Sequence, residues 1–523
     1  MLGTALEGRE SVTRPTQVVG IDLGTTYSAI ALVQPSGTAE LLHNRDGGNI
    51  TPSVVLFDGP EVVVGVQAKH QASAFPLDTV QFVKRQMGNP DFRFLPESSD
   101  TEYRPEEISA FILRYLIADA RNATGQHVTD AVITVPAYFD EAQRTATRQA
   151  GEIAGINVVG IVNEPTAAAV SFGLSSHFRG NLLVFDLGGG TLDVTLMRCG
   201  GGQFDVLAVG GDRNLGGYDF DNAIILWARA QFVRQGGTAF DEDSPEGAQL
   251  RERAEDAKRR LSSTQSASMF VSSGTASAKL TLTRDEFAAL SRHLLVRCEY
   301  LLEEVVDSAG LTFADVDKVL LVGGSTRIPM IRELVERVSG LVPDTSIHPD
   351  EAVALGAAML GELRRADATG QAPALRHGSA VAVRDVVAHG LGVVADNEQS
   401  MPSNCIVVWP NTPIPCQIVA DHFSTVVDGQ RSLMLQVTEG DEDGVDPRFV
   451  RILGTSELKL RGRPAHSPIR IVFSCDLDGI LHIEVVDLVD GANLGEMEIE
   501  RAANLTDDEV ARTREDLVWT KVR

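Results

Sequence analysis

Residues 182–193 read LLVFDLGGGTLD, an apolar run that passes through an aspartate and three glycines into a threonine. Residues 18–26 read VVGIDLGTT, a shorter version of the same pattern. Each is predicted to be a β-hairpin with a glycine-rich turn, because β-forming residues continue on both sides of the glycines. The recurrence of one pattern predicts two halves of similar design.

A third glycine turn follows a predicted strand at residues 319–327, which read VLLVGGSTR. Apolar residues over 328–338 recur at helical spacing, so this turn is predicted to start a helix. Strands and helices alternate through the first two thirds of the chain, which is typical of an α/β fold. Further helices are predicted at 105–122, 141–154, 220–234, 245–262 and 284–309.

The composition changes at residues 365–380, where small residues, glycine and proline predict a linker. Beyond it, apolar and polar residues alternate, for example at Leu433 and Leu435, which predicts antiparallel strands. A capping box from Thr506 to Glu509 starts one last helix. The expected divisions are an extension at 1–16, an α/β domain at 17–364, a linker at 365–385, a β domain at 386–505 and a short helix at 506–523.

Two such hairpins facing each other would hold a polyphosphate, because turn amides and threonine hydroxyls donate hydrogen bonds to anions. Asp22, Asp186 and Asp193 flank these turns, and carboxylate oxygens are ligands that hydrated Mg²⁺ takes. Arg327, in the third turn, is placed to stack on a base. The pattern predicts a nucleoside triphosphate site that is not a P-loop, since GxxxxGK[ST] does not occur in the chain.

Each of these residues also has a plainer interpretation when it is taken alone. A single turn of glycine and threonine is more often an ordinary tight turn than a phosphate site. Lys84 and Arg85 are typical of an exposed helix face, and Glu164 before a proline is typical of a helix start. Repetition of the hairpin at half-chain spacing favours the phosphate site.

Composition limits the partners. The 523 residues carry a net charge of −26, and without a basic patch such a chain repels nucleic acid and acidic membrane surfaces. The five cysteines are scattered and form no C-x-x-C pair, and the histidines lack metal-ligand spacing, so reduced thiols and no zinc site are expected. No secretory signal or membrane span is recognisable, which favours the cytoplasm.

Eight motifs taken together resemble the 70-kDa heat-shock chaperone family of the DnaK type, over nearly the whole chain. The resemblance implies an α/β, actin-like, two-lobed ATPase domain followed by an antiparallel, peptide-binding β-sandwich. The motifs are GIDLGTTYS (20–28), VITVPAYF (132–139), IVNEPTAAA (161–169), DLGGGTLD (186–193), LGGYDFD (215–221), AKRRLSS (257–263), LVGGSTRIP (321–329) and PDEAVALGAA (349–358).

The resemblance also implies ATP or ADP with Mg²⁺, and K⁺ as a further ion, and it assigns a role to each matching residue. Lys84, Glu164, Thr191 and Asp186 would be catalytic, and Asp22, Asp186 and Asp193 would order Mg²⁺ mostly through water. Phosphates would be bound by Gly24, Thr25, Thr26, Tyr27, Gly188, Gly189, Gly190, Thr191, Gly216 and Gly217. Adenosine would be bound by Glu255, Lys258, Arg259, Ser262, Gly323, Gly324, Ser325, Arg327 and Asp350.

The family's partners are unfolded or extended polypeptides, a J-domain protein and a nucleotide-exchange factor. Pro136, Arg144 and Asp385 match its relay from nucleotide to linker. Val393, Phe423, Val426, Leu433 and Leu435 fall where it lines its peptide groove, although alternating apolar residues are more often sandwich core. A monomer is expected.

Several positions depart from the family pattern. Gly160 stands where the family has an arginine that serves the J-domain partner, and the loops at 88–101 and 266–278 are short, so weaker stimulation by such partners is expected. The linker is less apolar and carries Arg384, which should weaken its docking. The chain stops where a helical lid would continue, which predicts fast peptide exchange.

The expected function is that of an ATP-hydrolysing chaperone whose nucleotide state modulates binding of extended apolar segments. One alternative is a module that binds ATP without coupling and serves one dedicated protein partner. A third, less favoured, is a small-molecule kinase on the same actin-like scaffold, which shares the phosphate hairpins but has no counterpart of the β domain.

Overall fold

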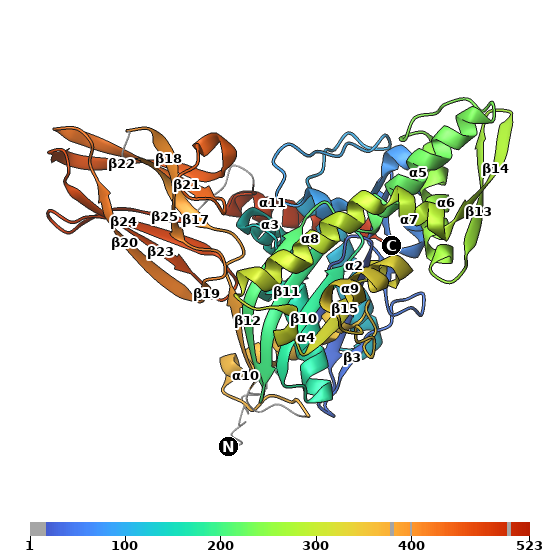
Figure 1. Cartoon of the computed structure of the whole chain (residues 1–523), viewed down its shortest axis with the longest axis horizontal. Helices are drawn as coiled ribbons and strands as arrows, with labels where there is room; N and C mark the ends of the chain where they lie inside the picture. Colours follow the sequence, from blue (N-terminus) through green and yellow to red (C-terminus); the bar gives the residue numbers. More distant parts are fainter. Residues whose placement is uncertain (1–16, 377–380, 398–399, 499–503) are drawn as a thin grey trace, which may run out of the picture.

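The computed structural model describes residues 17–376, 381–397, 400–498 and 504–523 (Figure 1). The expected extension at 1–16 lies outside the described residues, as do 377–380 of the expected linker. The first part of the chain forms two lobes, which we call lobe I and lobe II, and each is built on one of the two glycine hairpins. Among the described helices, none has the length and apolar character needed to cross a membrane.

Lobe I is built on the first hairpin. Strand β1 (Val18–Asp22) pairs antiparallel with β2 (Tyr27–Val33) and parallel with β8 (Asp130–Val135), in a sheet ordered β3-β2-β1-β8-β9. Helix α10 (Ala352–Thr369) packs against β1 and β2, and it continues beyond residue 364. The other elements are β3 (Ala39–Leu41), β4 (Thr51–Pro52), β9 (Asn157–Asn163), α2 (Pro105–Thr124), α3 (Glu141–Ile153) and α4 (Glu164–Ser176).

Lobe II repeats this arrangement. Strand β10 (Gly180–Leu187) pairs antiparallel with β11 (Leu192–Gly200) and parallel with β15 (Lys318–Val322). The predicted internal repeat is therefore confirmed. The other elements of lobe II are β12 (Gln203–Asp212), α5 (Gly217–Arg234), α6 (Pro245–Leu261), β13 (Ser266–Ser273), β14 (Ala276–Thr283), α7 (Arg284–Leu290), α8 (Arg292–Ser308), η3 (Phe313–Asp315), η4 (Gly324–Arg327) and α9 (Pro329–Ser339).

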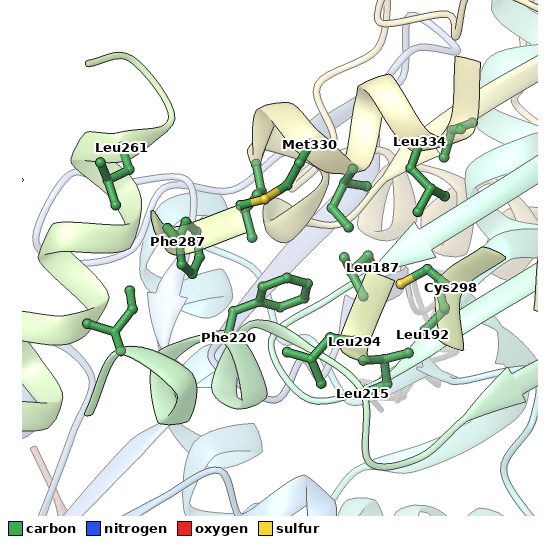
Figure 2. Packing of buried hydrophobic residues seen from close by; sticks show 14 of the residues in the cluster. Leu187, Leu192, Leu215, Phe220, Leu261, Phe287, Leu294, Cys298, Met330 and Leu334 are labelled. Atoms are coloured by element: carbon green, nitrogen blue, oxygen red, sulfur yellow. The ribbon is translucent and has the colours of Figure 1, made fainter. Parts of the chain in front are cut away.

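The core of lobe II fixes the second hairpin in place. Leu187 and Leu192, on either side of the glycine turn, point into an apolar cluster beneath the helices (Figure 2). Phe220 and Phe287 meet edge to face in the same cluster, with ring centroids 6.2 Å apart. The prediction of one helix over 284–309 was wrong, because the helix is interrupted at the fully buried Ser291, the residue between α7 and α8.

A small sheet on lobe I includes the last residues of the chain. Strand β6 (Glu61–Val64) pairs with β26 (Lys521–Val522), and Arg523 exchanges backbone hydrogen bonds of 2.8 and 2.9 Å with Val62 and Val64. Helix α11 (Asp507–Trp519) has the predicted capping box and packs on α3, with Leu517 in the lobe I core. The other elements here are β5 (Val54–Asp58), β7 (Thr79–Gln81), α1 (Val66–Gln71), η1 (Pro76–Asp78) and η2 (Val83–Gln86).

The β domain consists of two four-stranded antiparallel sheets that enclose an apolar core, as Figure 1 shows at the left. The first sheet is ordered β18-β17-β21-β22 and the second β20-β23-β24-β25. Its elements are β17 (Leu391–Asp396), β18 (Pro402–Val408), β20 (Cys416–Ser424), β21 (Gln430–Glu439), η5 (Pro447–Phe449), β22 (Arg451–Arg463), β23 (Pro468–Cys475), β24 (Leu481–Asp487) and β25 (Ala492–Glu498).

The linker docks onto lobe II as a strand. β16 (Ala382–Val386) extends the lobe II sheet by pairing parallel with β12, and β19 (Pro413–Ile414) pairs with β16 on its other side. The Arg384 side chain is 72% exposed and lies 3.8 Å from Asp205, so its charge stays in solvent while the linker is docked. The backbone ladder, rather than an apolar side chain at this position, holds the linker here.

The β domain contacts lobe I through the turn between β23 and β24. Asp478 in this turn forms ion pairs with Arg148 and with Arg364, whose Nη1 lies 2.8 Å from Asp478 Oδ1. Arg364 also fills the space above Gly160, since a Cβ built on Gly160 would lie 2.0 Å from Arg364 Nη1. The position where the resemblance implied an arginine is therefore covered by an arginine from α10.

Candidate active site between the two lobes

A cavity of about 340 Å³ lies between lobe I and lobe II, where the two glycine turns meet. Most of the residues expected to bind nucleotide line it. These are Asp22, Gly24, Thr25, Thr26, Tyr27, Lys84, Glu164, Asp186, Gly188, Gly189, Thr191, Gly217, Glu255, Lys258, Arg259, Ser262, Gly323, Gly324, Ser325, Arg327 and Asp350.

The remaining three expected residues lie just behind this lining. Gly190 and Gly216 pack against each other, because a Cβ on Gly216 would lie 2.5 Å from the Gly190 nitrogen. Asp193 is buried directly opposite Asp186 in the β10–β11 ladder.

The two turns are in direct contact, which explains their glycines. A Cβ on Gly189 would lie 1.9 Å from the Thr26 hydroxyl, so any side chain there would drive the turns apart. The third turn approaches as closely: Gly323 has φ +81, and a Cβ there would lie 2.4 Å from the Leu187 carbonyl oxygen. Backbone N–H groups and hydroxyls from three turns therefore converge on one space, an arrangement suited to anions.

Three aspartates lie beside these turns in a buried acidic cluster. Burial and the nearby Glu164 raise the pKa of Asp22 to about 7 and that of Asp193 to about 7. The same two causes raise the pKa of Asp186 well above its usual range, with further repulsion from Asp193. Such a cluster costs free energy when ionised and alone, and a cation beside it would relieve that cost.

The cluster suits a hydrated divalent cation. The Asp193 Oδ2 atom is buried without a hydrogen-bond partner, while Oδ1 accepts a hydrogen bond of 2.9 Å from the Tyr138 N–H. Within the described ranges, no three carboxylate, histidine or cysteine side chains stand close enough together to ligate one ion directly. Mg²⁺ keeps several waters in most sites, so residues spaced in this way fit an ion held through water.

Lys84 and Glu164 form a buried ion pair on the lobe I side of the cavity. Lys84 lies in η2 and Glu164 is the first residue of α4, with Pro165 behind it as the helix-start reading predicts. The interpretation of Lys84 as a residue on an exposed helix face was wrong, because its side chain is only 6% exposed. Lys84 is the cation that lowers the pKa of all three aspartates, so it faces the acidic cluster.

The lobe II side offers polar groups suited to a nucleoside. Lys258 donates hydrogen bonds of 2.9 Å to the Gly217 carbonyl and 2.8 Å to Asp221. Ser325 Oγ donates to the Gly188 carbonyl at 2.8 Å, which ties the third turn to the second hairpin. Arg327 is half-exposed at the mouth and is held at 2.6 Å by Asp350.

Comparison with known proteins decides the family. A family model described as Hsp70 protein matches residues 18–521. The chain is 38% identical over 512 residues to the Chaperone protein DnaK of Thermotoga petrophila, which covers 95% of this chain and 83% of that protein. The chain belongs to the Hsp70 family. DnaK chaperones from Thermotoga maritima and Thermotoga neapolitana match at the same identity and coverage.

Membership in the Hsp70 family determines the fold class and the activity. The two lobes are the family's actin-like ATPase domain, and the two four-stranded sheets are its β-sandwich. The protein is an ATP-dependent chaperone of the DnaK type. A small-molecule kinase on the same scaffold is excluded, because the match continues through the β domain.

Two of the three residues expected to form the interdomain relay, Arg144 and Asp385, are joined by a hydrogen-bonded path through Asn163, and the third, Pro136, lies next to it. Arg144 donates to the Ala137 carbonyl, next to Pro136, at 3.2 Å and to Asn163 Oδ1 at 2.6 Å. Asn163 donates in turn to Asp385 of the linker at 2.8 Å. Burial raises the pKa of Asp385 and lowers that of Arg144.

The five expected groove residues are not equivalent in this structure. Val393 and Leu435 are 2% and 3% exposed and lie in the sandwich core. Phe423 and Leu433 are half-buried, and Val426 is 58% exposed. In this arrangement of the chain, the core interpretation describes Val393 and Leu435 better than an open groove does.

Sequence reasoning did not single out four residues that complete the cleft. Lys69 bridges the lobes, with its Nζ 2.9 Å from Glu255 and 3.0 Å from the Tyr27 hydroxyl. Phe82 and Tyr218 meet edge to face across the cavity, and Asp221 holds Lys258. Only Tyr218 and Asp221 carried a signal, since both lie in the LGGYDFD motif.

Proposed function

We propose that the cleft hydrolyses ATP with Lys84, Glu164, Asp186 and Thr191 as its catalytic groups. The observation that carries this proposal is the buried Lys84–Glu164 pair, which lies beside three aspartates where the two glycine turns meet. Phosphoryl transfer requires mainly positioning and charge neutralisation, and this constellation offers both.

Each group has a distinct task in this proposal. Lys84 Nζ contacts the terminal phosphate and neutralises charge that develops on it. The Glu164 carboxylate, held by that ammonium, orients the attacking water and accepts its hydrogen bond. The Thr191 hydroxyl and the amides of Gly188 and Gly189 hold the phosphate oxygens in line.

Mg²⁺ would be held near Asp22, Asp186 and Asp193 through water, and it would supply positive charge that offsets the negative charge of the phosphates. The chain's own contribution is to keep the three aspartates buried and close together. On the lobe II side, Arg327 stacks on the base, while Lys258 and Ser325 border the ribose. We include in this proposal that K⁺ binds as a second ion.

Nucleotide state is proposed to reach the β domain through Arg144, Asn163 and Asp385. The β domain, at 386–505, binds extended apolar segments of unfolded polypeptides by main-chain hydrogen bonds and a side-chain pocket. A J-domain protein and a nucleotide-exchange factor are proposed partners, and the cytoplasm the proposed location. The Arg364 guanidinium lies above Gly160, where the family carries an arginine, and a partner that used it would have to displace its ion pair with Asp478.

The test is single-turnover ATP hydrolysis with Mg²⁺, with and without an extended apolar peptide. Glu164→Gln should abolish hydrolysis while ATP still binds. Glu106→Gln is the matched control, because Glu106 is also a buried carboxyl but lies outside the cleft. Hydrolysis that survives Glu164→Gln would refute the catalytic assignment. Hydrolysis that peptide does not accelerate would favour the uncoupled module that serves one dedicated partner.

A further inference from the structure

Two cysteines that are far apart in the sequence face each other in the β domain. Cys416 begins β20, Cys475 ends β23, and the two are direct partners in the antiparallel ladder. Directly opposed residues in such a ladder have Cα atoms about 4.5–5.5 Å apart. Disulfides span Cα distances of about 4.4–6.8 Å, so the separation expected for this pair falls within the range that a disulfide bridges.

The surroundings of the two thiols differ. Cys475 is 3% exposed and belongs to the sandwich core, whereas Cys416 is half-buried and packs against that core. Burial, together with the facing Cys416, raises the pKa of Cys475. A disulfide is strongly oxidising when its reduced form is stabilised as a thiolate. The Cys475 thiolate is not stabilised in this way, which favours the disulfide form. Cys416 is the more exposed of the two thiols, so a reagent reaches it more easily.

The pair lies where the β domain attaches to the rest of the molecule. Ile414, two residues before Cys416, pairs with Asp385 of the docked linker. Asp478, three residues after Cys475, pairs with Arg148 and Arg364 of lobe I. Cys475 itself lines a cavity of about 220 Å³ between the domains. A disulfide between the two cysteines would therefore link the strand next to the docked linker to the strand that leads into the turn on lobe I.

We propose that Cys416 and Cys475 form a reversible intramolecular disulfide when the chain meets a disulfide oxidant of the glutathione class, and that the bond steadies the docked linker. The Cys416 thiolate attacks glutathione disulfide, forming a mixed disulfide and releasing one glutathione thiolate. The Cys475 thiol then loses its proton to solvent and attacks the Cys416 sulfur, which releases the second glutathione thiolate. The two cysteines are oxidised by two electrons, and one glutathione disulfide is reduced to two thiols, which take up the two protons.

The test uses the full chain, incubated with glutathione disulfide and then digested under acidic conditions. Mass spectrometry should find one linked peptide pair, Cys416 with Cys475, and thiol titration should fall from five thiols to three. Dithiothreitol should restore all five. Cys405→Ser is the matched control, because Cys405 is also half-buried but faces His422, with its Sγ 3.6 Å from the ring nitrogen. This variant should still form the link, whereas Cys416→Ser should not.

A lasting glutathione adduct on Cys416 with Cys475 still free would overturn the proposal, as would a link between other cysteines or no loss of thiols.

The proposed effect of the disulfide on the docked linker is tested by amide hydrogen exchange over residues 382–386. Exchange there should slow several-fold on oxidation of the natural chain and stay unchanged in oxidant-treated Cys416→Ser. Equal exchange before and after oxidation of the natural chain would refute the link to the docked linker.

Discussion

The Asn163 side-chain amide lies 2.8 Å from the Asp385 carboxylate, and Asn163 immediately precedes Glu164 at the proposed hydrolytic centre. Thr166, in the first turn of α4, donates to the same Asp385 oxygen at 3.2 Å. The linker is therefore held by the residues on both sides of Glu164. If Glu164 moves when phosphate leaves, Asn163 and Thr166 should transmit that movement directly to Asp385, with no other helix or strand between them.

Asp385→Ala should uncouple the two domains. Both donors on α4 and its N-cap lose their acceptor, so the linker strand keeps its backbone pairing but loses its side-chain contact with α4, while the cavity keeps all its lining groups. Coupling between sites is typically worth about 1–3 kcal/mol, and most of it should disappear. Peptide acceleration of single-turnover ATP hydrolysis measures this directly. Arg384→Ala, which changes the exposed neighbour, should keep the acceleration, and equal losses in both variants would contradict the specific role of Asp385.

Lys84→Ala should lower single-turnover hydrolysis by about 10²–10³-fold, the usual effect of removing one charge-stabilising donor. The variant leaves Glu164 buried without its cation, and it also removes a positive charge that lowers the pKa of Asp22, Asp186 and Asp193 alike. The neighbouring Arg85 pairs instead with Asp219 at 3.2 Å, so Arg85→Ala should have a much smaller effect on hydrolysis. A rate for Lys84→Ala within a few-fold of the natural chain would remove Lys84 from the catalytic set.

The acidic cluster predicts a pH dependence with a definite sign. Unfolded aspartates release their protons near pH 4, whereas folded Asp22 and Asp193 hold theirs to about 7. Between these values the folded, nucleotide-free protein binds more protons than the unfolded chain, so its stability falls as pH rises. Bound Mg²⁺ and ADP should reverse this loss, because the ion requires ionised carboxylates. Thermal unfolding from about pH 5 to about pH 8, with and without Mg²⁺–ADP, measures both effects.

Asp193→Asn removes one of the two groups and should flatten the pH dependence of the nucleotide-free protein. It should also weaken the stabilisation by Mg²⁺–ADP above about pH 7, where the natural aspartate is ionised. If the variant and the natural chain lose stability equally between acid and neutral pH, the dependence comes from other groups. Glu106, whose pKa burial raises to about 6, is the first of these to replace.

The local parts of the nucleotide site were predictable from the sequence, because each depends on a short contiguous pattern. Hairpins at Asp22 and Asp186 need only alternating apolar residues and turn glycines, and the helix start at Glu164 needs only the proline after it. In the β domain, the alternation of apolar and polar residues says less about which side chains form a functional site. An alternating apolar residue such as Val393 has the same pattern in a sandwich core as in a peptide groove, so its burial required the structure.

Contacts between distant segments had no sequence signal. Arg364 fills the space above Gly160 because α10 passes that strand, and nothing in either local sequence predicts the approach. The two residues of β26 are too few for periodicity to show, and their pairing with β6 is decided by the docking of α11. The facing of Cys416 and Cys475 likewise depends on strand order in the folded sheet.

Gly160→Ala should weaken the contact between the β domain and lobe I while leaving the fold intact. The new methyl group would meet Arg364 Nη1, the mobile end of a long side chain, so Arg364 can move aside. Its ion pair with Asp478 would be lost, leaving only Arg148, and partly exposed pairs are worth about 0–1 kcal/mol. Hydrogen exchange in the 476–480 turn should rise several-fold, and Arg364→Ala should have the same effect. Faster exchange in Arg364→Ala alone would show that the glycine is not required.

The C-terminal segment is an integral part of lobe I, and two adjacent residues test this. Leu517 is 4% exposed in the lobe I core, and its carbonyl accepts a hydrogen bond from Arg114, whereas Val518 beside it is 63% exposed. Leu517→Ala should lower the free energy of unfolding of this lobe by about 2–5 kcal/mol, the usual cost of such a cavity, while Val518→Ala should change it by less than about 0.5 kcal/mol. Urea unfolding of both full-length variants measures the difference. Equal midpoints would mean that α11 does not stay docked in solution. A large loss for Leu517→Ala alone would mean that α11 is anchored in the lobe I core through Leu517, which holds the chain next to β6 where β26 pairs with it.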